Sequence, residues 1–286
     1  MKHSFKGFVY VLVFSLTWSF MALTEKYAML KGNDPIKFAF QHFVVAAILM
    51  FFYVMYEKRS ITKIDKNSFY KIILIGVLGS GIAYTLNFIG LKYTTSMNFG
   101  FIIKSTVIFS VLLAHFFLKE KMSLQKGMYV IVLLFGVYLI STKGETFIPR
   151  SGDLLILSSA FLISSANVIS KPVLKNHSPE IVSFYRFLVA ILFLLVIGLV
   201  FVPNFFEIQN PLLVLGSGLF DFLTILFLYK TIKETNVSYM TMMSMMFSVF
   251  VAIFGYLILS ETFVPIQLLG AALIIGSVVM IHKSKI

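Results

Sequence analysis

The sequence contains no cysteine, a single tryptophan and few charged residues. Without cysteine there can be no disulfide, thiolate metal site or cysteine nucleophile, whereas the cellular compartment of a membrane-embedded chain stays open. Charged residues make up 13% of the 286 residues and hydrophobic residues 59%. A soluble globular chain carries about twice that share of charge. The composition therefore indicates a polytopic membrane protein.

Ten apolar segments follow one another along the chain, and each can cross the ~30 Å hydrocarbon core of a bilayer as a helix. The first is too long for the hydrophobic part of a signal peptide and lacks a small-residue cleavage site, so we expect it to remain as a helix. Prolines are expected at or beside the helix ends, where a missing N–H costs least, and none is expected to interrupt a span. The predicted spans are 5–24, 36–56, 70–91, 96–118, 125–142, 152–171, 180–202, 211–230, 238–259 and 265–282.

The formal charge of +12 comes from lysine and arginine in the short segments between the apolar runs. This distribution indicates membrane orientation and does not favour a nucleic-acid partner. With the N-terminus inside, inner segments hold 16 of these residues and outer segments hold 6. We therefore expect a multi-pass protein of the plasma membrane with both termini in the cytoplasm.

The sequence pattern of residues 91–120 is repeated without a gap in residues 232–261, so the chain contains two copies of one unit. A second pair of matching stretches is PIKFAFQHF, at 35–43, and PEIVSFYRF, at 179–187. Five helices per copy is an odd number, so the second copy must be inverted in the membrane. The predicted fold is all-α, with ten transmembrane helices in one membrane domain made of two inverted repeats, residues 1–143 and 151–286.

The Pro-Phe-Arg-Phe opening of the seventh helix, the Leu-Lys-Tyr-Thr turn before the fourth and the Phe-Leu-Lys-Glu…Gly…Gly junction after it resemble the EamA-type branch of the drug/metabolite transporter superfamily. The resemblance covers essentially the whole chain. It implies a ten-helix, five-plus-five carrier. Relatives commonly have a proline in the middle of helices 4 and 9, where this sequence has Thr106, Val107, Phe247 and Ser248, so it predicts no proline kink there.

Lys104 and Asp221 are ionisable residues predicted inside spans, where such groups are costly and are candidates for function. Both lie between about 12 and 15 Å below the outer ends of their helices. One interpretation makes Lys104 the contact for a substrate carboxylate or phosphate, with Asp221 as its counter-ion or as the contact for a substrate amine. The other has Lys104 reaching the outer headgroups and Asp221 protonated in a helix contact.

Other polar and aromatic residues of the spans complete the candidate substrate site. Trp18, His42, Tyr84 and Asn87 are expected in the outer half, and Asn167, Arg186 and His115 in the inner half. For each one a hydrogen bond between helices is the alternative to ligand contact. Arg186 can also reach the inner surface as an anchor. His115, eleven residues after Lys104, is expected on the same helix face, and Glu120 and Glu261 are expected to be structural.

The leading hypothesis is a secondary transporter that moves a small metabolite, such as an amino acid or a related organic anion or zwitterion, by alternating access. The alternative is a ligand-binding membrane sensor or assembly subunit without transport. No catalytic residue, metal site or cofactor is predicted, so the chain is not expected to be an enzyme. The expected partners are a small-molecule substrate and membrane lipid, and the protein is expected to be a monomer or a weak dimer.

Overall fold

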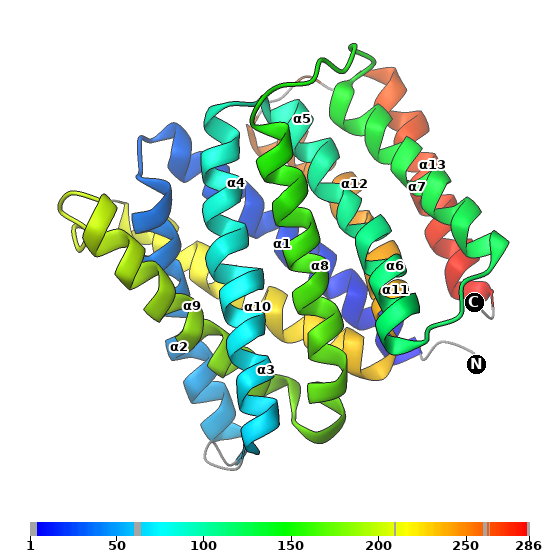
Figure 1. The fold of residues 1–286 in the computed structure, drawn as a ribbon. Coiled ribbons are helices and arrows are strands. Elements are labelled where there is room, and N and C mark those ends of the chain that lie inside the picture. Colours follow the sequence, from blue (N-terminus) through cyan, green and yellow to red (C-terminus); the bar gives the residue numbers. More distant parts are fainter. Residues whose placement is uncertain (1–4, 60–63, 209, 260–261, 263, 285–286) are drawn as a thin grey trace.

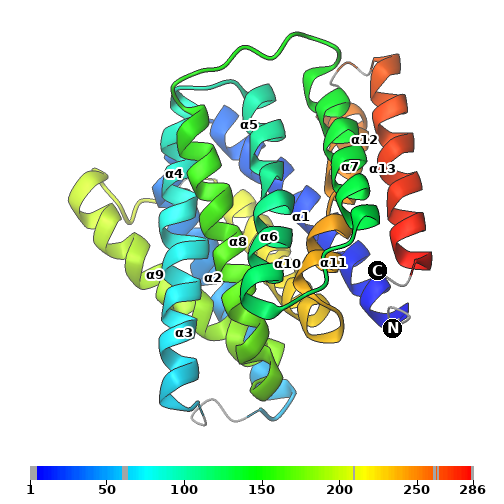
Figure 2. The ribbon, with the colours of Figure 1, turned by 45° about the vertical axis from the view of Figure 1, so that its right-hand side comes forward.

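The computed structural model describes residues 5–59, 64–208, 210–259, 262 and 264–284, and within these ranges it contains helices and no strand (Figures 1 and 2). Ten helical stretches are long and apolar enough to cross a membrane. The prediction of an all-α protein with ten spans is confirmed.

Two of the first five spans are made of several elements. The other three are α1 (Phe5–Leu30), α2 (Pro35–Tyr56) and α7 (Leu124–Thr142). The third span consists of α3 (Lys66–Gly76), the π-helix η1 (Val77–Ile82) and α4 (Ala83–Lys92), and the fourth consists of α5 (Ser96–Ile102), the 3₁₀ turn η2 (Ile103–Ser105) and α6 (Thr106–Leu118). The second five are α8 (Asp153–Asn176), α9 (Pro179–Phe201), α10 (Pro211–Glu234), α11 (Val237–Met243) with α12 (Met246–Leu259), and α13 (Pro265–Lys283).

Local sequence accounts for most helix starts. Proline stands at the first position of α2, α9, α10 and α13, where its fixed φ suits the helix and its missing N–H is not needed. The prediction that no proline lies within a span is wrong at Pro172, because α8 continues to Asn176. Only about one turn follows this proline, so the helix loses one hydrogen bond near its end.

The fourth and ninth membrane spans are interrupted at equivalent positions, although neither span contains proline. The 3₁₀ turn at 103–105 corresponds, 141 residues later, to the break at 244–245 between α11 and α12. In each break a serine hydroxyl donates to the backbone: Ser105 to the Ile102 carbonyl, and Ser244 to the Thr241 carbonyl at 2.7 Å. Such bonds compete with the regular helix ladder. Both repeats therefore have a break at this level without a proline, which the absence of proline did not predict.

The two halves of the chain are interleaved, so that helices of one pack mainly against helices of the other. In both views α1 crosses beside α10, and α7 and α13 form a pair at one side of the bundle (Figures 1 and 2). Further packed pairs are α2 with α9 and α10, α4 with α8, and α6 with α8 and α11. Buried residues from both halves form one large core cluster. Neither half is an independent core.

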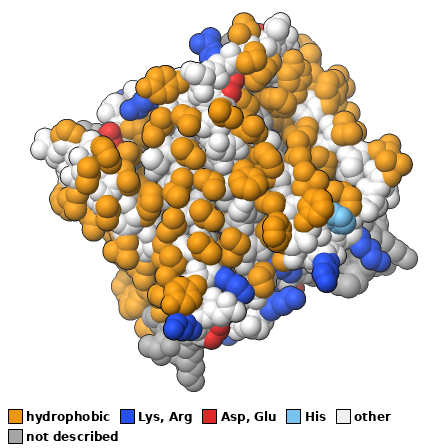
Figure 3. Space-filling view, viewed as in Figure 1, with side chains coloured by type: hydrophobic (Ala, Val, Ile, Leu, Met, Phe, Trp, Pro, Cys, Tyr) orange, Lys and Arg blue, Asp and Glu red, His pale blue; other side chains and the backbone are white. Residues whose placement is uncertain are grey.

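The outer surface of the bundle is apolar around its middle. Figure 3 shows hydrophobic side chains across the face of the bundle and Lys and Arg side chains towards its two ends. Large exposed side chains include Phe116, Leu192, Val196 and Leu212, each more than 60% exposed. Soluble proteins rarely expose so much contiguous apolar surface. This surface therefore suits contact with lipid.

The α7–α13 pair depends on backbone contact at glycine. A Cβ atom added to Gly270 of α13 would lie 2.6 Å from the carbonyl oxygen of Gly136 in α7 and 2.9 Å from Ile140. We expect Gly270→Val to lower the free energy of unfolding by about 1–3 kcal/mol through overpacking. Gly276→Val is the matched control, since a Cβ at Gly276 on the same helix meets nothing within 4 Å. Thermal unfolding in detergent measures both; equal stability of the two variants would contradict the prediction.

Candidate functional site

Lys104 occupies the 3₁₀ turn η2 in the middle of the fourth span and is only 1% exposed. Its Nζ atom lies 4.1 Å from the centroid of the Trp18 ring, in α1, and 3.6 Å from that of Phe247, in α12. The centroids of these two rings are 4.2 Å apart. The ammonium thus lies inside the bundle against rings from both halves of the chain. It does not reach the outer headgroup region.

The Lys104 ammonium lacks a hydrogen-bond partner in the described part of the chain. Removing such a charge from water costs several kcal/mol. A cation–π contact is worth about 2 kcal/mol when desolvated, so the two rings offset part of that cost. The ammonium can donate three hydrogen bonds, and none finds an acceptor. The arrangement is suited to an anionic group that would accept them.

Asp221 of α10 lies beside His42 of α2, and among the described residues it forms no ion pair with Lys104. Its Oδ2 atom lies 3.7 Å from His42 Nε2, and the same nitrogen lies 4.0 Å from Oε1 of Glu25 in α1. The two side chains form no direct pair in this structure, because depth along a helix does not fix the direction in which a side chain points. A contact between them through a substrate stays a prediction.

Tyr84 and Asn87 of α4 lie one turn apart and are half-buried, as Trp18 is. The Tyr84 ring centroid is 5.2 Å from that of Phe43 and 6.4 Å from that of His42. Oδ1 of Asn87 is buried without a hydrogen-bond partner in the described chain. Tyr84 therefore lies beside His42 and Phe43. Asn87, one helical turn from Tyr84, has a side-chain oxygen that could accept a hydrogen bond.

Arg186 of α9 is buried and bound to protein groups, so it does not act as an anchor at the inner surface. Its Nε donates to Ser80 at 2.8 Å, Nη1 donates to the Tyr229 hydroxyl at 2.9 Å, and Nη2 donates to the Gly79 carbonyl. Ser80 and Gly79 belong to the π-helix η1. These contacts give Arg186 a structural role, because they join the third, seventh and eighth spans. Asn167 of α8 is buried, and no hydrogen bond among the described residues connects it to Lys104 or Asp221.

His115 lies on the exposed surface of α6 and does not share the buried face of Lys104. The nearby Glu120 has the structural role predicted for it. Its carboxylate accepts from the backbone N–H groups of Val237 and Ser238, at 3.0 and 3.1 Å. Glu261 lies outside the described residues.

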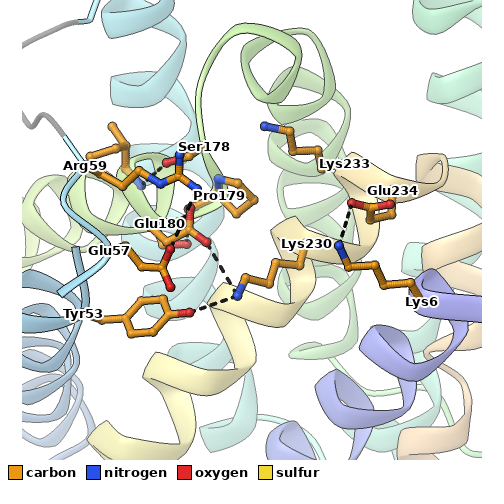
Figure 4. A network of polar contacts seen from close by, with 12 residues as sticks. Lys6, Tyr53, Glu57, Arg59, Ser178, Pro179, Glu180, Lys230, Lys233 and Glu234 are labelled. Atoms are coloured by element: carbon orange, nitrogen blue, oxygen red, sulfur yellow. Dashed lines mark hydrogen bonds and ion pairs between the residues drawn. The ribbon is translucent and has the colours of Figure 1, made fainter. Parts of the chain in front are cut away.

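Polar contacts tie the inner ends of helices from both halves together. Figure 4 shows Lys230 between Tyr53 and Glu180, with Nζ 3.2 Å from the Tyr53 hydroxyl and 3.6 Å from the Glu180 carboxylate. Lys6 approaches Glu234 at 3.8 Å in the same view. In addition, Lys171 donates to the carbonyls of Ile232 and Thr235, each at 2.5 Å. This end of the bundle, which we predict to be the inner one, is therefore held together by contacts that cross between the two halves.

The inner and outer segments of the fourth and ninth spans differ in how closely they pack. Their inner parts, α6 and α11, are packed together, and Glu120 at the end of α6 caps the start of α11. Their outer parts, α5 and α12, form no comparable packing in the described chain. The two helices thus meet near the inner surface and separate towards the outer one.

Two residues of the site, Glu25 and Phe247, were not predicted from the sequence. Glu25 was placed just beyond the first span, which was predicted to end at residue 24, whereas α1 continues to Leu30. Its position seven residues after Trp18, two helical turns, could have indicated a shared face. Phe247 was considered only as a replacement for proline. Its equivalence to Thr106, next to the Lys104 turn, was the available signal.

Comparisons with known proteins agree with the architecture. The profile of the EamA-like transporter family matches residues 5–142 and 150–282. A protein of known crystal structure superposes with a TM-score of 0.82 over 95% of this chain and 94% of its own, at 16% identity, which is a likeness of fold alone. The resemblance noted in the sequence is thereby confirmed.

Three of the relatives found are distant from this chain in sequence. An uncharacterized transporter of Methanothermobacter thermautotrophicus is 23% identical over 98% of this chain and 87% of its own length. A riboflavin transporter of Fusobacterium nucleatum is 25% identical over 99% of both chains. An S-adenosylmethionine/S-adenosylhomocysteine transporter of Chlamydia muridarum is 23% identical over 93% of this chain and 88% of its own.

The Arg186 contacts predict a large effect on stability. Arg186→Met leaves the Ser80 hydroxyl, the Gly79 carbonyl and the Tyr229 hydroxyl without this partner, and each buried unsatisfied group costs about 1–3 kcal/mol. We expect a clear fall in the thermal unfolding midpoint. Arg59→Met is the control, because Arg59 is exposed and its pair with Glu57, at 3.9 Å, is of the surface kind that is worth about 0–1 kcal/mol. Similar midpoints for both variants would remove Arg186 from its structural role.

Proposed function

Because the chain belongs to the EamA-like transporter family, we propose that it is a secondary transporter whose central site binds the anionic group of a small organic anion or zwitterion. The observation that carries this proposal is the Lys104 ammonium, buried between aromatic rings and without an acceptor. A carboxylate or phosphate of a substrate would supply both the acceptor and the opposite charge. An amino acid is one member of this substrate class.

Transport by alternating access is supported by the asymmetry of the two ends. In the proposed cycle, residues 1–143 and 151–286 rock against each other around Lys104, which lies at their interface with Trp18 and Phe247. The observed arrangement, with α6 capping α11 and α5 separated from α12, corresponds to a state closed on the inner side. The outer half of the site, lined by the half-buried Trp18, Tyr84 and Asn87, is then the half that admits substrate.

The energy source and location follow from the sequence. It contains no ATPase motif, so the carrier moves its substrate down a gradient, either by facilitated diffusion or coupled to an ion. The excess of lysine and arginine in the segments predicted to be inside supports a plasma-membrane protein with both termini in the cytoplasm. Flux into proteoliposomes separates this carrier from a membrane sensor, which would bind the same ligand without moving it.

The charge of Lys104 provides the first test. A thermal-shift screen of metabolites on the purified protein identifies a ligand, and its labelled form is then followed in proteoliposomes. We expect Lys104→Met, which copies Met245 of the other repeat, to insert and stay monodisperse while losing at least about tenfold of the flux, since ~1.4 kcal/mol of lost ion pairing is already tenfold. Lys92→Met, at an exposed lysine, should transport normally. Unchanged flux in Lys104→Met would refute the anion site.

Glu120 provides a test of the inner closure. Because the chain has no native cysteine, Asn167→Cys supplies the only thiol, at a buried position expected in the inner half. In this background we expect Glu120→Gln to weaken the α6–α11 junction and to increase the rate of labelling by a membrane-impermeant maleimide added from the inner side.

The matched control is Glu145→Gln, which changes an exposed carboxylate in the connection between the two halves. Labelling should stay slow in this control. If labelling is as slow with Glu120→Gln as with Glu145→Gln, Glu120 does not hold the inner side closed.

A further inference from the structure

Three ionisable side chains from three helices meet in the outer half of the bundle: Glu25 of α1, His42 of α2 and Asp221 of α10. His42 is 0% exposed and Asp221 is 1% exposed, whereas the Glu25 side chain is 19% exposed. His42 Nε2 lies 3.7 Å from Asp221 Oδ2 and 4.0 Å from Glu25 Oε1, and all three atoms are buried without a hydrogen-bond partner in the described chain. We refer to these residues as the outer cluster.

The position of the outer cluster relative to Lys104 follows from one contact. The Thr224 hydroxyl of α10 donates to the Thr17 hydroxyl of α1 at 3.1 Å, which sets the register of the two helices beside Trp18. Asp221 is three residues outward from Thr224, and Glu25 is seven residues outward from Trp18. At 1.5 Å per residue, the cluster lies about one to two turns outward from the Trp18–Lys104 contact.

The positive groups around the cluster act on it only from a distance. From α4 it meets the neutral Tyr84 ring. Arg186 of α9 interacts electrostatically with Asp221 but donates its hydrogen bonds to the neutral Ser80 and Tyr229, and Lys104 lies one to two turns inward. At the outer end of α2, Lys37 pairs with Glu207 at 3.5 Å. No lysine or arginine of the described residues forms an ion pair with Glu25 or Asp221. Two ionised carboxylates beside a neutral imidazole would therefore place two like charges in an apolar interior.

The occupant that fits this cluster is a proton. The N···O separations of 3.7 and 4.0 Å are too long for hydrogen bonds, so one added proton can draw His42 and a carboxylate together without new space. A sodium ion needs several more oxygen ligands, and a substrate amine needs room that the fully buried His42 and Asp221 do not leave. Among the described residues, no group of histidine and acidic side chains is placed to hold a metal ion.

We propose that Glu25, His42 and Asp221 form a proton-binding site and that its proton is coupled to transport, which rests on the proposed carrier function. Glu25, the most exposed of the three and five residues from the end of α1, receives the proton from water on the outer side. Protonation removes negative charge from above Lys104, whose ammonium then attracts an anionic substrate more strongly in this low-dielectric interior. Proton and substrate therefore bind together and leave together on the inner side.

The first experiment needs no substrate. Infrared spectra of the purified protein are recorded from alkaline to mildly acidic pH, and the carbonyl band of protonated carboxylic acids is identified by its shift in D₂O. We expect a step in this band that Asp221→Asn or Glu25→Gln abolishes. Glu180→Gln is the matched control and should keep the step, because Glu180 is a buried carboxylate paired with Lys230 at 3.6 Å. A step that survives both cluster variants would overturn the proton site.

The second experiment tests coupling in proteoliposomes with the labelled ligand found by the metabolite screen. With an inward pH gradient, the wild-type protein should accumulate ligand, whereas Asp221→Asn should exchange it across the membrane and fail to accumulate it. Wild-type exchange that is indifferent to the gradient would overturn the coupling. A wild-type protein that binds the ligand and exchanges none would instead contradict the carrier function, and the infrared step would still decide the proton site.

Discussion

The structure depends on one unsatisfied charge, the ammonium of Lys104. Its Nζ atom is buried, and the rings of Trp18 and Phe247 offset only part of the cost of removing the ammonium from water. A fold under selection for stability alone would have an apolar residue there, as the other repeat has with Met245. The rest of the bundle must be stable enough to hold this charge, and its interleaved helices and large common core provide that stability.

The same residue shows why interrupted helices matter. An unbroken helix would satisfy its backbone uniformly, whereas the fourth and ninth spans are broken at equivalent points, at η2 and at 244–245, and Lys104 and Phe247 meet beside these breaks. Below these points α6 and α11 are packed, and above them α5 and α12 are not. The breaks thus coincide with the level at which the two helices begin to separate. Helix segments on either side of a break can change their angle with little loss of hydrogen bonding.

Much of this architecture was predictable, because membrane thickness and a 141-residue repeat constrain a chain strongly. The burial of Lys104 was one of two interpretations that the sequence left open, whereas the number of spans follows from run lengths. The direction of side chains does not. His115 was expected on the face of Lys104 but is exposed, the His42 neighbour of Asp221 was not predicted because depth along a helix does not give the direction of a side chain, and Glu25 was missed because α1 extends six residues beyond its predicted end. Each of these errors concerns local geometry that depends on tertiary packing.

The repeats have divided structural and functional roles between equivalent positions. His42 and Arg186 occupy matching places in helices 2 and 7, and Asp221 and Ser80 are separated by the same 141 residues as Met245 and Lys104. In one pair, Arg186 donates a hydrogen bond to Ser80 and further bonds to Tyr229 and Gly79. In the equivalent pair, His42 and Asp221 are too far apart for a hydrogen bond, and Glu25 lies near His42. Satisfied groups hold helices together, whereas groups left without partners can respond to a proton or an anion. The unsatisfied member of each pair of equivalent positions is therefore the one to which we assign function.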